Sequence, residues 1–233
     1  MTLPVIHRFV DADQLADASA ELIRARLDAA IAAAGRASLA LAGGKTPQAL
    51  HSRLAKLPLD WSRIHIYFGD DRCVPPYNEA SNYRAARKSL LDHVPIPGPH
   101  IHRIEGERGP GEAAALYNAV IAEAQPIDVI VLGMGDDGHT ASLFPGEPEP
   151  PAGALVAATH SPVSPQDRVT LTLPAIRACG TVILQVTGAN KAARLAQVYA
   201  ELTAGTPTFP VAKIGPAIWM IDEAAAALIP RSE

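Results

Sequence analysis

Residues 127–146 read IDVIVLGMGDDGHTASLFPG, and the rest of the chain is organised around them. The run 127–132, interrupted only by Asp128, is rich in β-branched residues and too short for a helix, so we expect a strand. Because it is apolar on both faces, the strand should be central and parallel. Ligands bind beyond the carboxyl ends of such strands. The turn that carries Asp136, Asp137 and His139 should therefore lie at the mouth of a site.

Three glycines of this stretch also match the dinucleotide fingerprint GxGxxG. That fingerprint needs an acidic residue about 20 residues further on, which holds a ribose hydroxyl. The next apolar segment, 154–159, leads into His160 and Ser161 without a carboxylate. We therefore do not expect a dinucleotide site at this loop.

Length and composition limit the class of protein. A chain of 233 residues fits one α/β domain, residues 1–233, with a sizeable core. The formal net charge of -4 gives no general attraction to nucleic acid or to anionic membranes. There is no long apolar run, the N-terminus carries acids where a signal peptide would be basic, and Cys73 and Cys179 are isolated. We expect a cytoplasmic protein that binds neither nucleic acid nor membrane.

Apolar strand-like segments alternate with helical segments along the chain. The strand-like segments are 5–10, 38–42, 61–68, 100–104, 127–132, 155–159, 169–173, 182–186, 211–214 and 218–221, and the helical segments end near residues 34, 55, 93, 125 and 202. Such alternation predicts an α/β fold with a largely parallel central sheet flanked by helices on both faces. The prolines at 148, 150 and 151 indicate a surface loop.

The segment 43–46, Gly-Gly-Lys-Thr, follows one of the predicted strands. Glycines leave backbone N–H groups open to an oxyanion or a phosphate, and Pro47 suits the first turn of a helix whose positive end points the same way. The spacing differs from that of a Walker loop. The alternative interpretation is a simple tight turn.

Asp70, Asp71 and Arg72 follow the next predicted strand, and Ser81 and Asn82 come soon after. Adjacent carboxylates on an extended chain point to different sides, so one could face a ligand while the other meets Arg72. A solvated salt bridge at the strand end explains the pattern equally well.

The third loop carries Asp137 and His139. An imidazole can take and return a proton near neutral pH, and a carboxylate two residues away can fix its tautomer. No serine lies in a GxSxG elbow, and nothing near the pair His100 and His102 completes a metal site, so neither a serine nucleophile nor a metal is expected. Two cations further along, Arg168 and Lys191, are either phosphate ligands or ordinary surface residues.

Together these motifs resemble the 6-phosphogluconolactonases of the group related to glucosamine-6-phosphate deaminase. The matching segments occur in family order: LAGGKTP at 41–47, GDDRCVP at 69–75, SNY at 81–83, GMGDDGHTASLFPG at 133–146, RVTLTLP at 168–174, and the glycine-to-lysine turn 188–191. Two motifs depart from the pattern. Asp71 stands where the family commonly has glutamate, and Ala42-Gly43-Gly44-Lys45 stands where it commonly has Ser-Gly-Gly-Ser or Ser-Gly-Gly-Arg.

The resemblance implies a modified Rossmann-like fold and hydrolysis of 6-phospho-D-glucono-1,5-lactone to 6-phospho-D-gluconate, in the oxidative pentose phosphate pathway, without metal or organic cofactor. His139 would act as general base and then acid, oriented by Asp137 or by Asp70. Oxyanion donors would be backbone N–H groups around Gly43 and Gly44 or along 135–138. Loose association with dehydrogenases of the same pathway is a further expectation. The residues expected to bind the sugar phosphate are Gly43, Gly44, Lys45, Thr46, Arg72, Asn82, Arg168 and Lys191.

Two alternative functions remain within this resemblance. Glucosamine-6-phosphate deaminases follow the loop with Asn-Glu-Pro-Gly, whereas this chain has Leu143-Phe144-Pro145-Gly146 and lacks the additional acid. A non-catalytic sugar-phosphate sensor of the same fold would carry an N-terminal DNA-binding module, and here the α/β pattern begins within the first few residues. The lactonase therefore fits the sequence best.

Overall fold

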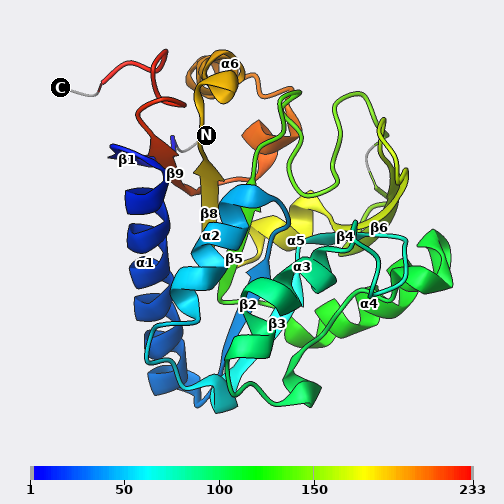
Figure 1. Ribbon diagram of the computed structural model, residues 1–233. Coiled ribbons are helices and arrows are strands. Elements are labelled where there is room, and N and C mark those ends of the chain that lie inside the picture. The colour runs from blue at the N-terminus through cyan, green and yellow to red at the C-terminus, as the bar shows by residue number, and fades with distance from the viewer. Residues whose placement is uncertain (1–2, 149, 232–233) are drawn as a thin grey trace.

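The computed structural model describes residues 3–148 and 150–231, and Figure 1 shows their arrangement. The strands are β1 Val5–Phe9, β2 Ala37–Leu41, β3 Ile64–Phe68, β4 Asp70–Arg72, β5 Val129–Gly133, β6 Val156–His160, β7 Asp167–Leu171, β8 Thr181–Val186 and β9 Ile218–Asp222. The α-helices are α1 Ala12–Ala34, α2 Lys45–Leu54, α3 Asn82–Ser89, α4 Pro110–Ala124, α5 Leu173–Arg177 and α6 Ala192–Ala204. Short 3-10 helices are η1 Trp61–Arg63, η2 Leu91–His93, η3 Gly98–His100, η4 Gly106–Arg108, η5 Ala189–Lys191 and η6 Pro210–Lys213.

Six strands form the central sheet in the order β1-β9-β8-β5-β2-β3, and every neighbouring pair is parallel. Helices lie on both faces of this sheet, so the predicted fold class is confirmed (Figure 1). The strand order reverses between β2 and β5, because the chain continues from β2 to β3 on one side and from β5 to β8 on the other. Ligands of open α/β sheets bind at such a switch point.

The strand β5 lies at the centre of the molecule. Val129, Ile130 and Val131 are each at most 1% exposed, as a strand buried on both faces requires. The helix α1 shows the same agreement between pattern and burial: the Asp11 carboxylate accepts a hydrogen bond from the Gln14 N–H, and Gly35 ends the helix with φ 76°. The sequence thus predicts both elements for physical reasons that the structure bears out.

A second, three-stranded antiparallel sheet has the order β4-β7-β6. The sequence predicted β6 and β7 but not their separate sheet. The connection between them is a short turn closed by the Ser161 N–H and the Gln166 carbonyl (2.7 Å), and a parallel pair would need a crossover of a dozen or more residues. This small sheet brings Arg72 of β4 beside Arg168 of β7.

Two predicted strands are wrong. The segment 211–214 lies in η6, where the Ala212 N–H bonds to the Phe209 carbonyl (2.9 Å) and the Val211 N–H bonds to the Gly138 carbonyl (3.3 Å). The segment 100–104 contributes a single isolated bridge, between Ile66 and Ile101. A short apolar run cannot distinguish a strand from a turn that tertiary contacts hold in place. Within the described ranges, no helix combines the length and apolarity needed to cross a membrane.

Candidate active site

The loop that leaves β5 folds back on itself as a closed turn. The Gly135 N–H donates to the His139 carbonyl (2.9 Å), and the Gly138 N–H donates to the Gly135 carbonyl (3.1 Å). A Cβ on Gly135 would lie 2.1 Å from His139 Nδ1, and Gly138 has φ +88° with its Cβ direction blocked by Phe209. Gly135 is therefore required because the imidazole lies directly against the turn, and Gly138 is required by its positive φ and by the contact with Phe209.

Asp137 holds the imidazole of His139. Its Oδ1 lies 2.6 Å from His139 Nδ1 and also accepts the His139 backbone N–H at 3.0 Å. Burial raises the pKa of Asp137, but the hydrogen bonds from the backbone and ring of His139 outweigh it and lower that pKa. An ionised carboxylate on Nδ1–H leaves the lone pair of Nε2 free, which is the form that a general base needs.

Asp70 has other partners. Its Oδ2 accepts from the Ser142 hydroxyl at 2.6 Å, and its Oδ1 accepts from the Asn82 side-chain amide at 3.2 Å. Throughout the described residues, no hydrogen bond joins Asp70 to His139. Of the two aspartates that could orient the imidazole, Asp137 is thus the one in contact, and Asp70 links the loop of His139 to α3.

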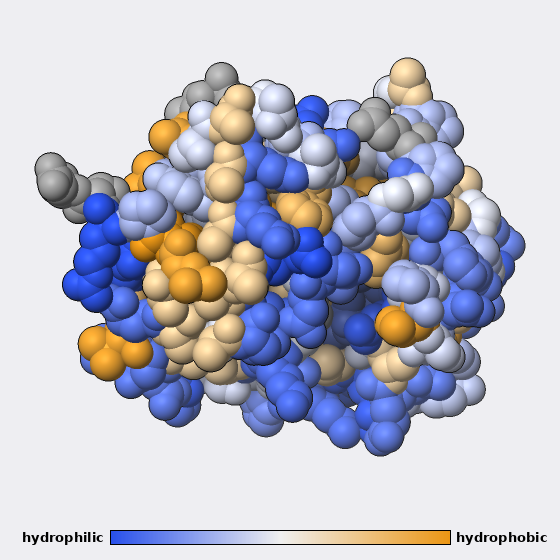
Figure 2. Space-filling model, turned by 90° about the horizontal axis from the view of Figure 1, so that it is seen from above, coloured by the Kyte–Doolittle hydropathy of each residue, from blue (hydrophilic) through white to orange (hydrophobic). Residues whose placement is uncertain are grey.

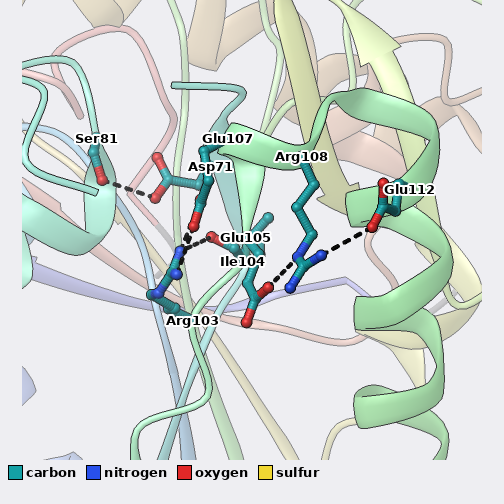
Figure 3. A network of polar contacts seen from close by, with 8 residues as sticks. All are labelled: Asp71, Ser81, Arg103, Ile104, Glu105, Glu107, Arg108 and Glu112. Carbon is teal, nitrogen blue, oxygen red and sulfur yellow. Dashed lines mark hydrogen bonds and ion pairs between the residues drawn. The ribbon is translucent and has the colours of Figure 1, made fainter. Parts of the chain in front are cut away.

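Asp71 points to the opposite side and fixes the start of α3. Its carboxylate accepts from the backbone N–H groups of Arg72, Asn82 and Tyr83 at 2.8, 2.7 and 3.0 Å. It also accepts from the Ser81 hydroxyl at 3.2 Å, as Figure 3 shows. Burial raises the pKa of Asp71 to about 6, although the backbone hydrogen bonds oppose the shift. Asp71 therefore meets Arg72 through the backbone, while the Arg72 guanidinium donates to the Ala80 carbonyl.

The glycine turn after β2 faces the same end of the sheet. Gly44 has φ 104° and begins α2 without a side-chain cap. A Cβ on Gly43 would lie 2.0 Å from Asn82 Oδ1, so Asn82 packs directly on this turn. The hydroxyls of Thr46 and Thr187 are 2.8 Å apart. Among the described contacts, the N–H groups of Gly43 and Gly44 have no acceptor, and Lys45 is exposed.

Two arginines are neighbours in the small sheet. Arg72 and Arg168 are cross-strand partners, and Arg168 is only 5% exposed. Burial, and then the charge of Arg72, lowers the pKa of Arg168. The Nη1 of Arg168 is buried without a hydrogen-bond partner in the part of the chain that the structure describes. A buried, unsatisfied cationic donor is costly for the fold.

Lys191 reaches the loop of His139 from η5. Its Nζ lies 2.6 Å from Asp136 Oδ1, which also accepts from the Asn190 side-chain amide at 3.0 Å. The hydrogen bond from Lys191 is the main cause that lowers the pKa of Asp136. Arg194 donates to the Asp136 carbonyl at 3.1 Å and stacks on Phe209, which packs against Gly138. The loop is thus braced from α6 and from the segment before η6.

Most of the predicted residues lie on segments that follow the carboxyl ends of β2, β3, β5 and β8, and Arg168 lies on β7 opposite Arg72. Figure 2 looks down on this end, where hydrophilic residues surround a shadowed hollow. Sequence reasoning missed Ser142, Arg194 and Phe209. Ser142 lies inside the quoted stretch 127–146, so its position was the available signal, whereas the contacts of Arg194 and Phe209 come from distant segments without a motif.

Comparisons with known proteins agree with this arrangement. The family described as glucosamine-6-phosphate isomerases/6-phosphogluconolactonase matches residues 10–219. The 6-phosphogluconolactonase of Nostoc sp. is 40% identical over 222 residues, which cover 90% of this chain and 91% of that protein. The 6-phosphogluconolactonase of Rhizobium meliloti is 37% identical over 205 residues, 84% of this chain and 88% of that protein.

Solved structures give the same result. The 6-phosphogluconolactonase from Thermotoga maritima has a TM-score of 0.83 with 29% identity, covering 94% of this chain and 99% of that chain. The enzyme of that name from Trypanosoma brucei has a TM-score of 0.86 with 27% identity, covering 99% and 100%. A monomeric glucosamine-6-phosphate deaminase has a TM-score of 0.83 at 18% identity, which shows a shared fold alone.

Proposed function

Because the chain belongs to the family of glucosamine-6-phosphate isomerases and 6-phosphogluconolactonases, we propose that it hydrolyses 6-phospho-D-glucono-1,5-lactone with His139 as general base. It is a hydrolase of the pentose phosphate pathway, as its relatives of known name are 6-phosphogluconolactonases over most of its length. The observation that carries the mechanism is the 2.6 Å contact between Asp137 and His139 on a loop at the switch point of the sheet. No step below requires a metal ion or an organic cofactor.

The first step is attack of water on the lactone carbonyl. His139 Nε2 takes a proton from the water as its oxygen forms a bond to C1, and Asp137 stabilises the imidazolium that results. As the water oxygen bonds to C1, negative charge develops on the former carbonyl oxygen. The unbonded N–H groups of Gly43 and Gly44 are the proposed donors to that oxyanion, because Gly135 and Gly138 use theirs to close the turn.

The second step opens the ring. The tetrahedral intermediate collapses, the bond from C1 to the ring oxygen breaks, and the His139 imidazolium returns its proton to that oxygen. The product is the open-chain acid with a free hydroxyl, and His139 is again neutral. One imidazole thus serves first as base and then as acid.

Phosphate binding fixes the lactone against His139. Arg72 and Arg168 form the proposed main receptor, because Arg168 Nη1 lacks a partner within the described contacts. Lys191 is paired with Asp136, and an arriving phosphate dianion competes with that exposed carboxylate for Nζ. Thr46, Asn82 and the residues of the glycine turn complete the proposed wall of the site.

Hydrolysis of freshly generated lactone at mildly acidic pH, where spontaneous opening is slow, tests the proposal. A coupled dehydrogenase follows the 6-phosphogluconate. We expect a rate well above background for the parent, a kcat reduced by about 10² to 10⁴ for His139→Ala, and parent activity for His160→Ala. Background rates from the folded parent would contradict the function, and ammonia release from glucosamine-6-phosphate would then identify a deaminase. A cytoplasmic location, one α/β domain and loose association with pathway dehydrogenases stay predictions.

A further inference from the structure

A second cavity lies beside α3, outside the candidate active site. Its volume is about 440 Å³, and its wall is formed mainly by two tyrosines and four cations: Tyr77, Tyr83, Arg84, Arg87, Lys88 and Arg103. One carboxylate, Asp92, also lines it. We propose that this cavity binds a nucleotide, with the tyrosine rings against the base and the cations on the phosphates. The proposal does not rest on the proposed function.

The charge of the cavity is opposite to that of the chain. The protein carries 20 lysines and arginines against 24 acids, yet four cations and one acid line this cavity. Arg84 pairs with Glu79 at 3.3 Å and Arg87 pairs with Asp92 at 2.8 Å, and the side chains of Glu79 and Arg87 are 90% and 52% exposed. Exposed ion pairs of this kind are weak and easily exchanged for a phosphate. Lys88 makes no ion pair with any residue in the described ranges.

The aromatic part of the wall has one fixed ring and one free ring. Tyr83 packs edge-on against Phe68 with centroids 5.9 Å apart, and the Arg103 guanidinium lies 5.9 Å from the centre of the Tyr83 ring. Tyr77, on the loop between β4 and α3, is 77% exposed. A fixed aromatic wall with an exposed second ring can hold a planar heterocycle by stacking, which sugar phosphates alone do not need.

Arg103 is held in position before any ligand arrives. Figure 3 shows its guanidinium bonded to both carboxylate oxygens of Glu107, at 2.6 and 2.9 Å. The neighbouring Arg108 bonds to Glu105 and Glu112, which ties this segment to α4. The volume of the cavity also falls within the range of small-molecule sites.

Calorimetry with ADP on the 233-residue chain, at low salt and without divalent cations, tests the proposal. We expect one site with a Kd of about 10⁻⁴ M or tighter, and at least roughly tenfold weaker binding of adenosine and of pyrophosphate. Tyr77→Ala should weaken ADP binding about fivefold and leave pyrophosphate binding unchanged, because stacking involves only the base. Lys88→Gln should weaken both, because it removes a phosphate cation. Both side chains are exposed, so neither variant should impair folding.

Arg168→Met is the control for binding at the candidate active site. We expect its ADP affinity to equal that of the parent. Loss of ADP binding in Arg168→Met together with parent affinity in Lys88→Gln would place the ligand in the active site and overturn the proposal. So would the absence of heat at about 5 mM ADP. Parent affinity for ADP in Tyr77→Ala would also overturn the proposal, because the cavity would then bind anions without recognising a base. Displacement of ADP by an acidic peptide at equal concentration would have the same meaning.

Discussion

His139 and Asp137 lie on a closed glycine turn, whereas His160 and Asp167 face each other across β6 and β7 at the edge of the small sheet. The Nδ1 to Oδ1 distance is 2.6 Å in the first pair and 3.5 Å in the second. The side chains of the first pair are 33% and 44% exposed, and those of the second are both 58% exposed. The same two residue types are thus held rigidly at the switch point and left solvated at the edge. The surrounding backbone, and not the pair itself, decides which histidine is positioned to act.

Replacing the aspartate of each pair should give the largest difference. In Asp137→Asn the amide cannot stabilise an imidazolium and no longer selects the Nδ1–H tautomer, so we expect kcat for the lactone to fall about 10³-fold. In Asp167→Asn we expect parent kcat, because water already screens that pair. Steady-state kinetics of both purified variants measure the effect. Equal activities of Asp137→Asn and the parent would show that Asp137 does not orient the base.

Two glycines of the same stretch test how far the backbone controls His139. A Cβ at Gly135 would lie 2.1 Å from His139 Nδ1, whereas at Gly133 it would meet nothing within 4 Å. We expect Gly135→Ala to lower kcat about 10²-fold by displacing the imidazole, and Gly133→Ala to stay within about threefold of the parent. The comparison needs only kcat and a melting curve for each variant. Equal losses in both would indicate a general disturbance of the loop.

Arg168 and Arg177 offer a similar contrast between a buried and an exposed cation. Arg168 Nη1 has no partner among the described residues, while Arg177 donates its Nε to the Lys213 carbonyl at 2.7 Å. We expect Arg168→Met to raise KM about 30-fold and to leave Tm unchanged or higher, because an unpaired buried charge is removed. Arg177→Met should leave KM unchanged. An unaltered KM in Arg168→Met would remove that residue from the phosphate site.

The sequence predicted the features that local chemistry determines. Neighbouring residues in the sequence are enough to determine three features. These are the strand at 127–132, the glycine turn at 43–44 and the loop of Asp137 and His139. The small antiparallel sheet, and the link from Ser142 to Asp70, depend on residues that meet only when distant segments pack. The strand predicted at 211–214 was wrong because the apolar run forms η6, which is held by the hydrogen bond from the Val211 N–H to the Gly138 carbonyl. Such contacts carry no local signal.

A third histidine, His51, extends the comparison to the core and gives the smallest expected effect. It is 2% exposed, its Nδ1 lies 2.9 Å from the Ser89 hydroxyl, and burial lowers its pKa to about 4. The unfolded chain therefore binds this proton more readily, so the contribution of His51 to stability is present above pH ~6.5 and is lost as the pH falls towards 4. We expect a loss of about 1 kcal/mol between pH 7 and pH 5.5.

Asp71 acts with the opposite sign, since burial raises its pKa to about 6 and the folded chain holds that proton between pH ~4 and 6. The free energy of unfolding of the parent should therefore change less with pH than His51 alone predicts. The matched variant His51→Gln is needed to separate the two groups. Urea unfolding of both proteins at pH 7 and pH 5.5 measures the difference in the free energy of unfolding. An identical pH dependence in parent and variant would show that His51 does not titrate differently in the two states. A difference of about 1 kcal/mol would show that burial keeps His51 neutral in the core. The side chain of His139, in contrast, is 33% exposed at the switch point.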